Sequence, residues 1–582
     1  MTTFKPASFP PADTPVPTYE LRLMTTHAAT GYFMPVPKDA SDFQATLAYL
    51  QNHPNDDFMH RWGLQQVLQM PLAKVEEMLS SDPRDPVLTA LLLEAIITHA
   101  PLAPMKQQVD TAMMTALQDA SPLLILRSET LPDQKLHRQW IALLKGNLHR
   151  HQRLPAPSET GLAPLFEDEV PVERIALSAI VHPSAPKSAA SSSPDFEAVY
   201  TRAMDGLLDA GIRLEEEMRH ESSLSPIALL RRWQMETRVE QDRHHFLFRG
   251  GQTAYGKGLS LERARASCAM EIAERCSSFA TVVNGMLPDT AQKHKLYRAP
   301  LSQLQNEERS ALDPNAMALE VPYEDQPIYW IEGIGCDAEG KYAVLVPYQA
   351  AFLFANLDEI CLFSGLGSTG LAAGWSLAQA KFHALLECIE RDAEAVQLYD
   401  PRRCFRLATR DGMVDGLLAD YRRRDIDVIF QDCSAEFGIP CYKCFVIGAD
   451  GNITKGTSAH FAGWQAALAA LTETPYPYPH GPASRPAPAD LPVRYLEELP
   501  DYTSGNVESD LQRLEALLAA NQLHPLYVNL TRQDVGIPVV RALVPGLELV
   551  ADFDRFSRVS PRLYQNYRQG FEVSCPHSES HG

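Results

Sequence analysis

The chain has 582 residues, of which 45% are hydrophobic and 21% are charged, so it is long enough for several globular domains and an ample core. Its formal net charge of −21 disfavours nucleic acid or an anionic membrane as the main partner, because both attract basic surfaces. No apolar run reaches the roughly 18 residues that span a bilayer and no signal peptide is evident, so we expect a cytoplasmic protein.

The first 152 residues are expected to differ from the rest of the chain. Residues 1–40 are rich in proline and should be extended or poorly ordered. Residues 41–152 carry apolar side chains three and four positions apart, with Pro or Asp-Pro between the runs, which predicts an all-α array of helical hairpins of the tetratricopeptide type. Such an array would recruit a peptide or a partner protein. The alternative is a purely structural cap or a dimerising cap, and only the dimerising cap would make the protein a homodimer.

The segment after this array contains a pattern that is typical of nucleotide-binding loops. Residues 153–196 are rich in Pro, Ser and Ala and predict a linker, and a further helix is expected at 195–221. After a short predicted strand, residues 251–257 fit the G-x-x-x-x-G-K pattern of a phosphate-binding P-loop. However, Gly258 stands where a P-loop has the Ser or Thr that contacts Mg²⁺. The P-loop is therefore the weaker of two hypotheses for nucleotide binding.

Two predicted helices carry the same polar pattern. In each helix, polar residues recur at steps of four, four, three and four, which places them along one face. The first stripe consists of Arg263, Ser267, Glu271, Glu274 and Ser278, and the second of Gln379, His383, Glu387, Glu390 and Glu394. An arginine follows the second glutamate of each copy, namely Arg275 and Arg391. A single copy would usually be a solvated face with weak ion pairs, but the surrounding residues are mostly small or apolar, which is not typical of a helix in water.

The four glutamates of the two stripes predict a magnesium site. If the two helices meet, their carboxylates repel one another unless a cation lies between them. Ligands that are all oxygen atoms, without a Cys/His cluster, suit Mg²⁺ better than zinc. Magnesium held by carboxylates usually shares its coordination shell with phosphate. The first hypothesis is therefore a site for Mg²⁺ and a nucleotide.

Further along the chain, the sequence predicts strands and a weaker third copy of the helical pattern. Residues 329–353 are typical of paired strands with a turn at 338–340. Cys441 and Cys444 form a CxxC pair in a predicted strand, and no second pair is spaced to complete a zinc site. His460 lies near a small-residue turn before a helix that ends in Glu473, which resembles the first two copies.

The ordered motifs resemble the YcaO family, ATP-dependent enzymes that modify peptide backbones. The motifs are GKG at 256–258, SxxxExxER at 267–275, STGLAAG at 368–374, HxxxExxERDA at 383–393 and IPVVRALVPGLE at 537–548. The resemblance covers roughly residues 232–548. It implies an α/β core of internally repeated units, with ATP and Mg²⁺ in a cleft between the repeats, after the all-α region. We expect this domain at residues 197–560 and a C-terminal tail at 561–582.

The resemblance also assigns roles to individual residues. It implies that Glu271, Glu274, Glu387 and Glu390 bind Mg²⁺ and act in catalysis together with Arg541. It implies that the nucleotide is contacted by Lys257, Ser267, Arg275, Gln379, His383, Arg391 and Arg541. Two departures from the family pattern stand out: Gln379 replaces a common glutamate, and the chain ends without the Pro-rich terminus that is typical of azoline-forming members.

The implied reaction is the transfer of phosphate to a backbone amide oxygen after a nucleophile has added. A Cys or Ser of the substrate would give an azoline, and external sulfide would give a thioamide. Two alternatives stay open. One is a nucleotide-binding accessory factor for another enzyme, as in methylthiolation of ribosomal protein S12, and the other is a non-catalytic peptide-binding module, which the presence of Gln379 supports.

Overall fold

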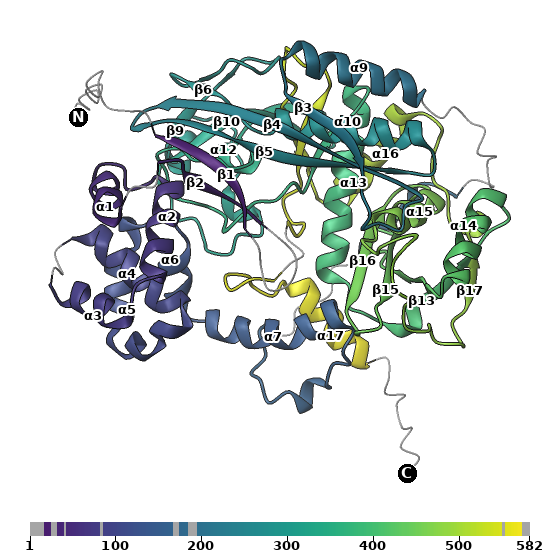
Figure 1. Ribbon diagram of the computed structural model, residues 1–582, viewed down its shortest axis with the longest axis horizontal. Helices are drawn as coiled ribbons and strands as arrows, with labels where there is room; N and C mark the ends of the chain where they lie inside the picture. The colour runs from purple at the N-terminus through teal and green to yellow at the C-terminus, as the bar shows by residue number, and fades with distance from the viewer. Residues whose placement is uncertain are drawn as a thin grey trace.

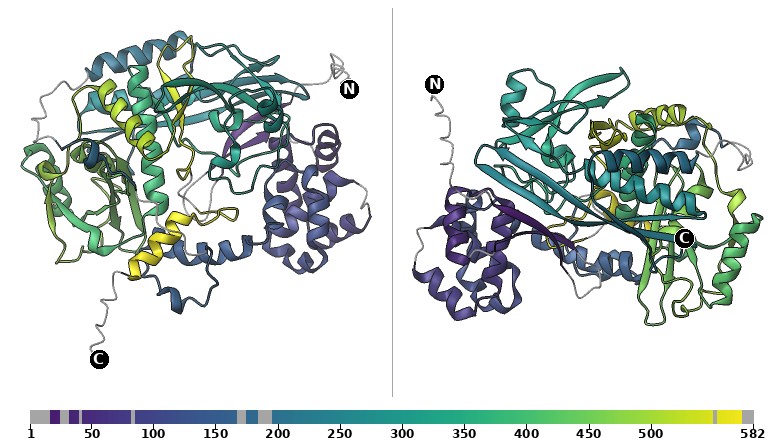
Figure 2. Two further views of the ribbon diagram at one scale, coloured as in Figure 1. Left: turned by 180° about the vertical axis from the view of Figure 1, so that it is seen from behind. Right: turned by 45° about the horizontal axis from the view of Figure 1, so that its top comes forward.

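The computed structural model describes residues 17–24, 32–39, 42–81, 85–166, 174–183, 195–549 and 553–572. Three β-sheets and the helices packed on them form the body of the molecule, and a group of short helices lies at one end (Figure 1). Figure 2 shows this helical group and the third sheet at opposite ends of the molecule. The α/β class expected from the sequence is confirmed, whereas the internal repetition of its units stays a prediction.

Two strands occupy part of the segment that was expected to be extended or poorly ordered. β1 (Thr18–Met24) and β2 (Tyr32–Pro37) form an antiparallel hairpin, and β1 lies parallel to β5 (His244–Gly258). Tyr19 and Leu21 are buried, because alternate side chains in the first part of β1 point into the core. The described part of residues 1–40 therefore belongs to the first sheet, and the remainder of this Pro-rich segment lies outside the described residues.

The expected N-terminal helices are present. They are α1 (Phe43–Asn52), α2 (Asp57–Leu68), α3 (Leu72–Ser81), α4 (Pro86–Thr98), the 3-10 helix Ala100–Gln108, α5 (Thr111–Ala116), the 3-10 helix Gln118–Ala120, α6 (Ile125–Glu129) and α7 (Gln134–Arg150). Aspartate side chains cap the first turns of α1, α2, α4 and α5. α4 is buried almost all round and belongs to the same hydrophobic core as the first sheet. The tetratricopeptide type of the array stays a prediction.

Within the described ranges, no single helix combines the length and the apolar character that a membrane crossing requires. α4 and the 3-10 helix after it pass that test together by length and composition, and the pair is bent by 118° at its junction.

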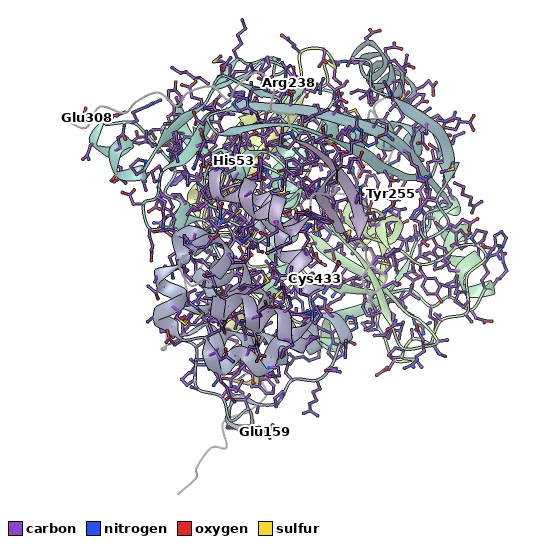
Figure 3. The ribbon with its side chains drawn as sticks, turned by 60° about the vertical axis from the view of Figure 1, so that its left-hand side comes forward. His53, Glu159, Arg238, Tyr255, Glu308 and Cys433 are labelled. Atoms are coloured by element: carbon purple, nitrogen blue, oxygen red, sulfur yellow. The ribbon has the colours of Figure 1, made fainter. Side chains whose placement is uncertain are left out.

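The first sheet is built around a long hairpin of β4 (Ile227–Gln241) and β5. Its strand order is β2-β1-β5-β4-β6-β7-β8, with β3 (Leu214–Arg219) paired to β4. The short strands at its edge are β6 (Val282–Val283), β7 (Met286–Leu287) and β8 (His294–Lys295). Figure 3 places Arg238 and Tyr255 toward opposite ends of the hairpin. Residues 251–257 lie within β5 and not in a loop before a helix, so the P-loop hypothesis is wrong.

The helix expected at 195–221 is shorter in the structure. α9 (Phe196–Asp209) ends just before Gly211, which has a φ of +71°. This left-handed conformation suits glycine and turns the chain away from the helix axis. The following residues form β3, because pairing with β4 satisfies their backbone hydrogen bonds.

The second and third sheets follow in the chain. The second sheet has the order β11-β10-β18-β19-β12, with β9 paired to β10, and the third has the order β16-β15-β14-β13-β17. Their strands are β9 (Tyr297–Ala299), β10 (Ile328–Cys336), β11 (Lys341–Pro347), β12 (Leu371–Ala373), β13 (Cys404–Ala408), β14 (Ile429–Asp432), β15 (Cys441–Ile447), β16 (Ile453–Ala459), β17 (Val493–Tyr495), β18 (Leu526–Asn529) and β19 (Val539–Leu543). The predicted strand pair is confirmed as β10 and β11, and Cys441 and Cys444 are buried, free thiols of β15.

Three helices position the site. α10 (Leu261–Ser277) packs on β5, α13 (Leu377–Val396) packs on β12 and β19, and α15 (Gly463–Glu473) packs on β15 and β16. α10 and α13 carry the two predicted stripes, and each begins after a serine that caps its first turn. α10 approaches β5 closely because Gly256 has no side chain there: a Cβ at this position would lie 2.0 Å from the Ala264 carbonyl oxygen.

The remaining helices cover the sheets or connect them. They are α8 (Leu177–Ile180), α11 (Leu301–Asn306), α12 (Tyr348–Ala351), α14 (Gly412–Arg423), α16 (Val507–Ala520), α17 (Pro561–Glu572) and the 3-10 helices Pro157–Glu159, Pro314–Ala316, Pro401–Arg403 and Leu496–Glu498. The expected tail at 561–582 begins with α17, whose Arg562 forms an ion pair with the fully buried Asp392 of α13. The helix therefore anchors the C-terminal half of α13.

Candidate functional site

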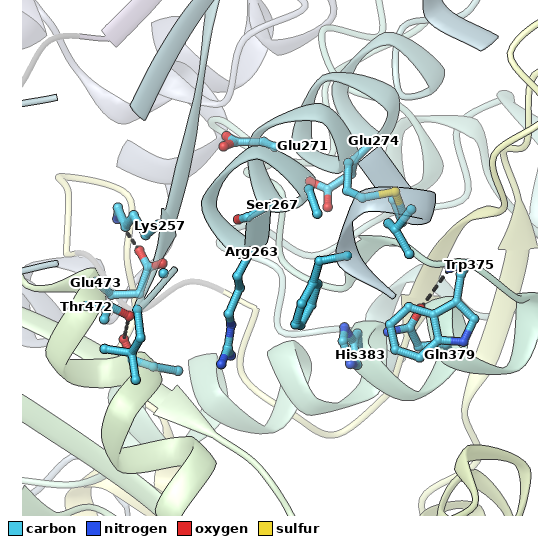
Figure 4. A pocket seen from close by; sticks show the side chains of 18 of the residues that line it. Lys257, Arg263, Ser267, Glu271, Glu274, Trp375, Gln379, His383, Thr472 and Glu473 are labelled. Atoms are coloured by element: carbon cyan, nitrogen blue, oxygen red, sulfur yellow. Dashed lines mark hydrogen bonds and ion pairs between the residues drawn. The ribbon is translucent and has the colours of Figure 1, made fainter. Parts of the chain in front are cut away.

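A cleft of about 360 Å³ lies where α10, the start of α13 and the end of α15 come together beside β5. Six of the predicted nucleotide- or metal-binding residues line it: Lys257, Ser267, Glu271, Glu274, Gln379 and His383. Figure 4 shows Lys257 at one end of the cleft and Gln379 and His383 at the other. The first stripe thus faces the start of the second across one hollow, although the two are far apart in sequence.

Five other predicted residues lie outside the lining of this cleft. They are Arg275, Glu387, Glu390, Arg391 and Arg541. The two stripes nevertheless lie within electrostatic range of each other, because the charge of Glu387 contributes to the raised pKa of Glu274. The structure therefore brings the two acidic stripes together. The catalytic, metal-binding and nucleotide-binding roles of these residues stay predictions.

The carboxylates of the first stripe are only partly neutralised. Glu271 Oε2 accepts a hydrogen bond of 2.7 Å from the backbone N–H of Tyr255. Arg275 Nε lies 3.8 Å from Glu271 and 3.6 Å from Glu274. Burial, together with the charge of Glu387, raises the pKa of Glu274 to about 8, although Arg275 opposes this shift. Glu274 is thus buried between the positive charge of Arg275 and the negative charge of Glu387, and the arginine only partly offsets the effect of burial.

The carboxylates of the second stripe are in a similar environment. Burial raises the pKa of Glu387, against the opposing charges of Arg391, Arg275 and Arg541. Burial also raises the pKa of Glu390 to about 8, with Arg391 opposing and Glu387 adding to the shift. Clustered carboxylates with raised pKa values are a common feature of sites that bind a cation or transfer a proton.

Glu394, the last residue of the second stripe, has a structural role. Its Oε1 accepts hydrogen bonds from Lys455 Nζ at 2.7 Å and from Thr457 Oγ1 at 3.2 Å. Its Oε2 lies 3.0 Å from Arg391. Although burial opposes the shift, Lys455 and Arg391 lower the pKa of Glu394 to about 2. This carboxylate is already neutralised and joins α13 to β16.

Arg541 is fully buried on β19 and does not reach the cleft. Both of its terminal nitrogens donate to the Gly367 carbonyl oxygen at 3.0 Å. Burial lowers its pKa to about 10, against the effect of Glu387. Among the described residues, its Nε has no hydrogen-bond partner. Gly367 belongs to the glycine-rich segment before β12, so Arg541 ties this segment to β19.

The structure adds residues that the stripe pattern did not assign to the site. Glu473 forms an ion pair with Lys257 at one end of the cleft. Its signal in the sequence was the fainter third copy of the turn and helix. Phe196, Trp375 and Met270 form apolar parts of the wall, and Arg263 lies over the Phe196 ring at 5.9 Å. The sequence analysis missed Phe196 and Trp375, because they lie on α9 and on the turn before α13, outside the polar pattern that α10 and α13 share.

The donor chemistry of the site fits Mg²⁺. The side chains offer carboxylate oxygens, and burial raises the pKa values of Glu274 and Glu390, with the charge of Glu387 adding to both shifts. Within the part of the chain that the structure describes, no three His, Cys, Asp or Glu side chains are grouped closely enough to hold a metal ion. The glutamates would therefore have to change rotamer to share one cation.

Gln379 has a defined place in the structure. Its side-chain oxygen accepts a hydrogen bond of 2.8 Å from the backbone N–H of Trp375. It therefore holds the turn before α13, while its amide faces the same cleft as His383. A glutamate at position 379 could accept the same hydrogen bond. Glutamine in place of the family's glutamate therefore preserves the local fold and removes one negative charge.

The fold and the site together define an α/β protein in which a carboxylate-lined cleft lies among α10, α13 and α15, and in which the P-loop pattern is part of a strand. Residues 255–548, just over half of the chain, match the family model described as YcaO cyclodehydratase, ATP- and Mg²⁺-binding. The chain belongs to the YcaO family, and ATP and Mg²⁺ are its cofactors.

Two curated relatives resemble the chain. An uncharacterized protein of Methanothermobacter thermautotrophicus is 28% identical over 340 residues, which is 52% of this chain and 84% of that protein. A second uncharacterized protein, from the tfuA 3′ region of Rhizobium leguminosarum bv. trifolii, is 27% identical over 234 residues, 38% of this chain and 53% of that protein. The matched region thus spans about half the length of the second relative.

Two solved structures share similarity with the chain at low identity. YcaO from Methanopyrus kandleri, bound with AMPPCP and Mg²⁺, is 18% identical with a TM-score of 0.43, covering 62% of this chain and 94% of that one. A heterocyclase in complex with substrate and cofactor is 18% identical with a TM-score of 0.48, covering 63% of this chain and 55% of that one.

Proposed function

We propose that the protein is an ATP- and Mg²⁺-dependent enzyme that activates a backbone amide of a peptide or protein substrate. The product would be a thioamide or an azoline. The observation that carries this proposal is the convergence of two acidic stripes beside lysine and arginine side chains, in a chain of the YcaO family. The N-terminal helices would recruit the substrate or a partner protein.

The chemistry of the amide explains why such a site is useful. An amide oxygen is a poor leaving group, and bound ATP with Mg²⁺ supplies the phosphoryl group that makes it a good one. This reaction asks the protein for positioned charge more than for a covalent nucleophile. Glu271, Glu274, Glu387 and Glu390 would hold Mg²⁺. Lys257, Arg275 and Arg391 would neutralise the phosphates, and Arg541 would join them if Gly367 moved aside.

The walls of the cleft divide into a charged and an apolar part. Lys257, Glu271 and Glu274 belong to the charged part. Phe196 and Trp375 supply aromatic surface, on which a flat base can be held by apolar contact. The volume of about 360 Å³ is within the range of small-molecule sites. The arrangement can therefore take a nucleotide with its phosphates toward the glutamates.

The thiols nearest the site are poorly suited to act as nucleophiles. Burial raises the pKa of Cys268 and of Cys388 to about 12, so both are neutral at physiological pH. A neutral, buried thiol reacts slowly, since the thiolate is the reactive form. The attacking atom would therefore come from the substrate's own Cys or Ser, or from external sulfide.

Two measurements test the proposal. Isothermal titration of the full-length protein with ATP should show binding that is lost when EDTA removes Mg²⁺, and Glu274→Gln combined with Glu387→Gln should abolish it. Mass spectrometry of candidate peptides incubated with ATP and sulfide should show the loss of one water for an azoline or the exchange of one oxygen for sulfur for a thioamide. Absence of metal-dependent ATP binding would overturn the proposal, and binding without any peptide modification would favour an accessory role.

A further inference from the structure

One edge of β5 is left open beside the cleft. β1 pairs with β5 only from Leu247 to Gly250, whereas β4 pairs with β5 along its whole length. From Gly251 to Lys257, β5 therefore has a strand partner on one side only among the described residues. Backbone N–H and C=O groups at such an edge can pair with another extended chain. Figure 1 shows β1 lying beside β5 on this side of the sheet.

Alternation along the strand identifies the backbone groups that face outward. The N–H of Leu247 donates to Pro17 on the β1 side. Because the direction of the backbone groups repeats every second residue, those of Gly251, Thr253, Tyr255 and Lys257 point the same way. Tyr255 confirms this parity, because its N–H donates to Glu271 and not to a strand. The Gly251 carbonyl accepts a 3.3 Å bond from the neighbouring Gln252 side chain.

The open edge ends at the proposed active site. Lys257, at its end, lines the cleft, and Glu271 both lines the cleft and binds the Tyr255 N–H. From Gly251 to Lys257 the strand advances about 20 Å, at about 3.3 Å per residue. Because Glu271 already accepts from the Tyr255 N–H, an extended peptide would pair with β5 at Gly251 and Thr253, and its next backbone amide would reach the charged part of the cleft.

The other end of the edge lies in a basic hollow. This hollow has a volume of about 630 Å³ and includes Gly250 and Gly251 in its wall. Its charged residues are Arg22, Arg213, Arg249 and Arg532 against Glu20 and Glu236, and Arg532 is also paired with Asp534 at 2.6 Å, which leaves a surplus of one positive charge. Arg22 and Arg249 share Glu20, at 3.6 and 3.4 Å. A surplus of arginine is notable in a chain with a net charge of −21, and it favours an acidic ligand.

We propose that the peptide substrate binds to the open edge of β5 as an added strand, with acidic residues in the arginine-lined hollow and the reacting amide beside Lys257 and Glu271. Backbone pairing supplies affinity that does not depend on the side chains of the bound segment, and the arginines select an acidic flank. The inference rests on the proposed function, because the occupant is the substrate whose amide is modified.

Fluorescence anisotropy with the full-length protein tests the binding mode. The probe is a fluorescein-labelled ten-residue peptide with three glutamates followed by alternating Thr and Val. We expect saturable binding below millimolar concentration. Methylating alternate amide nitrogens on the pairing side should weaken binding by about tenfold, because each backbone hydrogen bond contributes about 1 kcal/mol. Equal affinity of the methylated and unmethylated probes, or no binding of either, would overturn the proposal.

Variants of the hollow test the charge preference. Arg22→Glu combined with Arg213→Glu should weaken binding of the acidic probe by about fivefold to tenfold and should improve binding of a lysine version. Arg238→Glu is the matched control, since Arg238 lies on β4 outside the hollow, is 57% exposed and forms an ion pair with Glu240. The same loss in the control would show a general charge effect and would contradict a specific hollow.

Hydrogen exchange locates the probe and separates this inference from the proposed function. Bound probe should slow hydrogen exchange of the Gly251 and Thr253 amides. Thr253→Pro removes an outward N–H, so this variant should bind the probe more weakly while its Mg²⁺-dependent ATP binding is unchanged. Probe binding without protection of these amides would reject the edge. Loss of metal-dependent ATP binding in the unaltered protein would instead reject the proposed function, while protection of the edge would still stand.

Discussion

Lys257 on β5 forms an ion pair with Glu473 at the end of α15, which joins the first sheet to the third across the mouth of the cleft. Lys455 on β16 forms a comparable pair with Glu394 near the end of α13. The two pairs differ in exposure. Glu394 is 7% exposed and fixed by further partners, whereas Glu473 is 51% exposed. Lys257 can therefore exchange Glu473 for a phosphate at little cost.

The first prediction concerns this exchange. Glu473→Gln should tighten Mg²⁺-dependent ATP binding by about twofold to fivefold, because an exposed ion pair contributes at most about 1 kcal/mol and its carboxylate competes with the phosphates. Lys257→Ala should weaken ATP binding. Isothermal titration measures both, with Glu498→Gln as the control, since Glu498 forms an exposed pair with Arg410. Weaker ATP binding in Glu473→Gln would show that this glutamate helps to bind the cation or the nucleotide.

The second prediction concerns pH. The pKa values of Glu274 and Glu390 are raised to about 8, so without Mg²⁺ the folded protein binds more protons than the unfolded chain between about pH 4.5 and 8. Stability that these groups provide at low pH is therefore lost as the pH rises through this window. Glu274→Gln with Glu390→Gln should match the parent at pH 5 and melt at a higher temperature at pH 8.

Added Mg²⁺ provides the control for the pH prediction. By binding the ionised carboxylates it should raise the melting temperature of the parent more at pH 8 than at pH 5. The double variant should show no such difference. A parent protein whose melting temperature depends on pH in the same way as that of the variant would contradict the raised pKa values.

The third prediction concerns the contact between α10 and β5. Gly256→Ala should lower the free energy of unfolding by about 1–3 kcal/mol, because the new Cβ would meet the Ala264 carbonyl at 2.0 Å and the Cys268 Cβ at 2.6 Å. Gly416→Ala is the matched control: no atom lies within 4 Å of its Cβ in α14, and alanine favours a helix by about 0.5–1 kcal/mol. Denaturant midpoints should therefore move in opposite directions.

The fourth prediction concerns the anchor of α13. Arg562→Ala should lower the free energy of unfolding by about 3 kcal/mol, because Asp392 would stay buried without its cation. Arg558→Ala removes an ion pair with the half-exposed Asp133, and we expect it to lower the free energy of unfolding by less than about 1 kcal/mol. Chemical unfolding of both variants makes the comparison. Equal losses would mean that α17 does not stabilise α13 through Asp392.

The sequence predicted those parts of the site that depend on local periodicity. The spacing of Glu271 and Glu274, and of Glu387 and Glu390, follows from a helix of 3.6 residues per turn, and both helices are present. The hairpin of β10 and β11 could also be predicted, because a short turn connects two runs that pair with each other. The β1–β2 hairpin was missed, since its stability comes from pairing with a strand more than two hundred residues away.

By itself, the sequence determined which side chains share a helix face, and its motifs placed the chain in the YcaO family. Only the tertiary structure decided that the charge of Glu387 acts on Glu274, that Glu473 reaches Lys257 and that Arg541 donates to the Gly367 carbonyl. It also decided that, among the described residues, one edge of β5 has no strand partner beyond Gly250. The reason is physical. A helical repeat is set by neighbouring residues, whereas burial, ion pairing and strand order are set by contacts between segments that the chain brings together only when it folds.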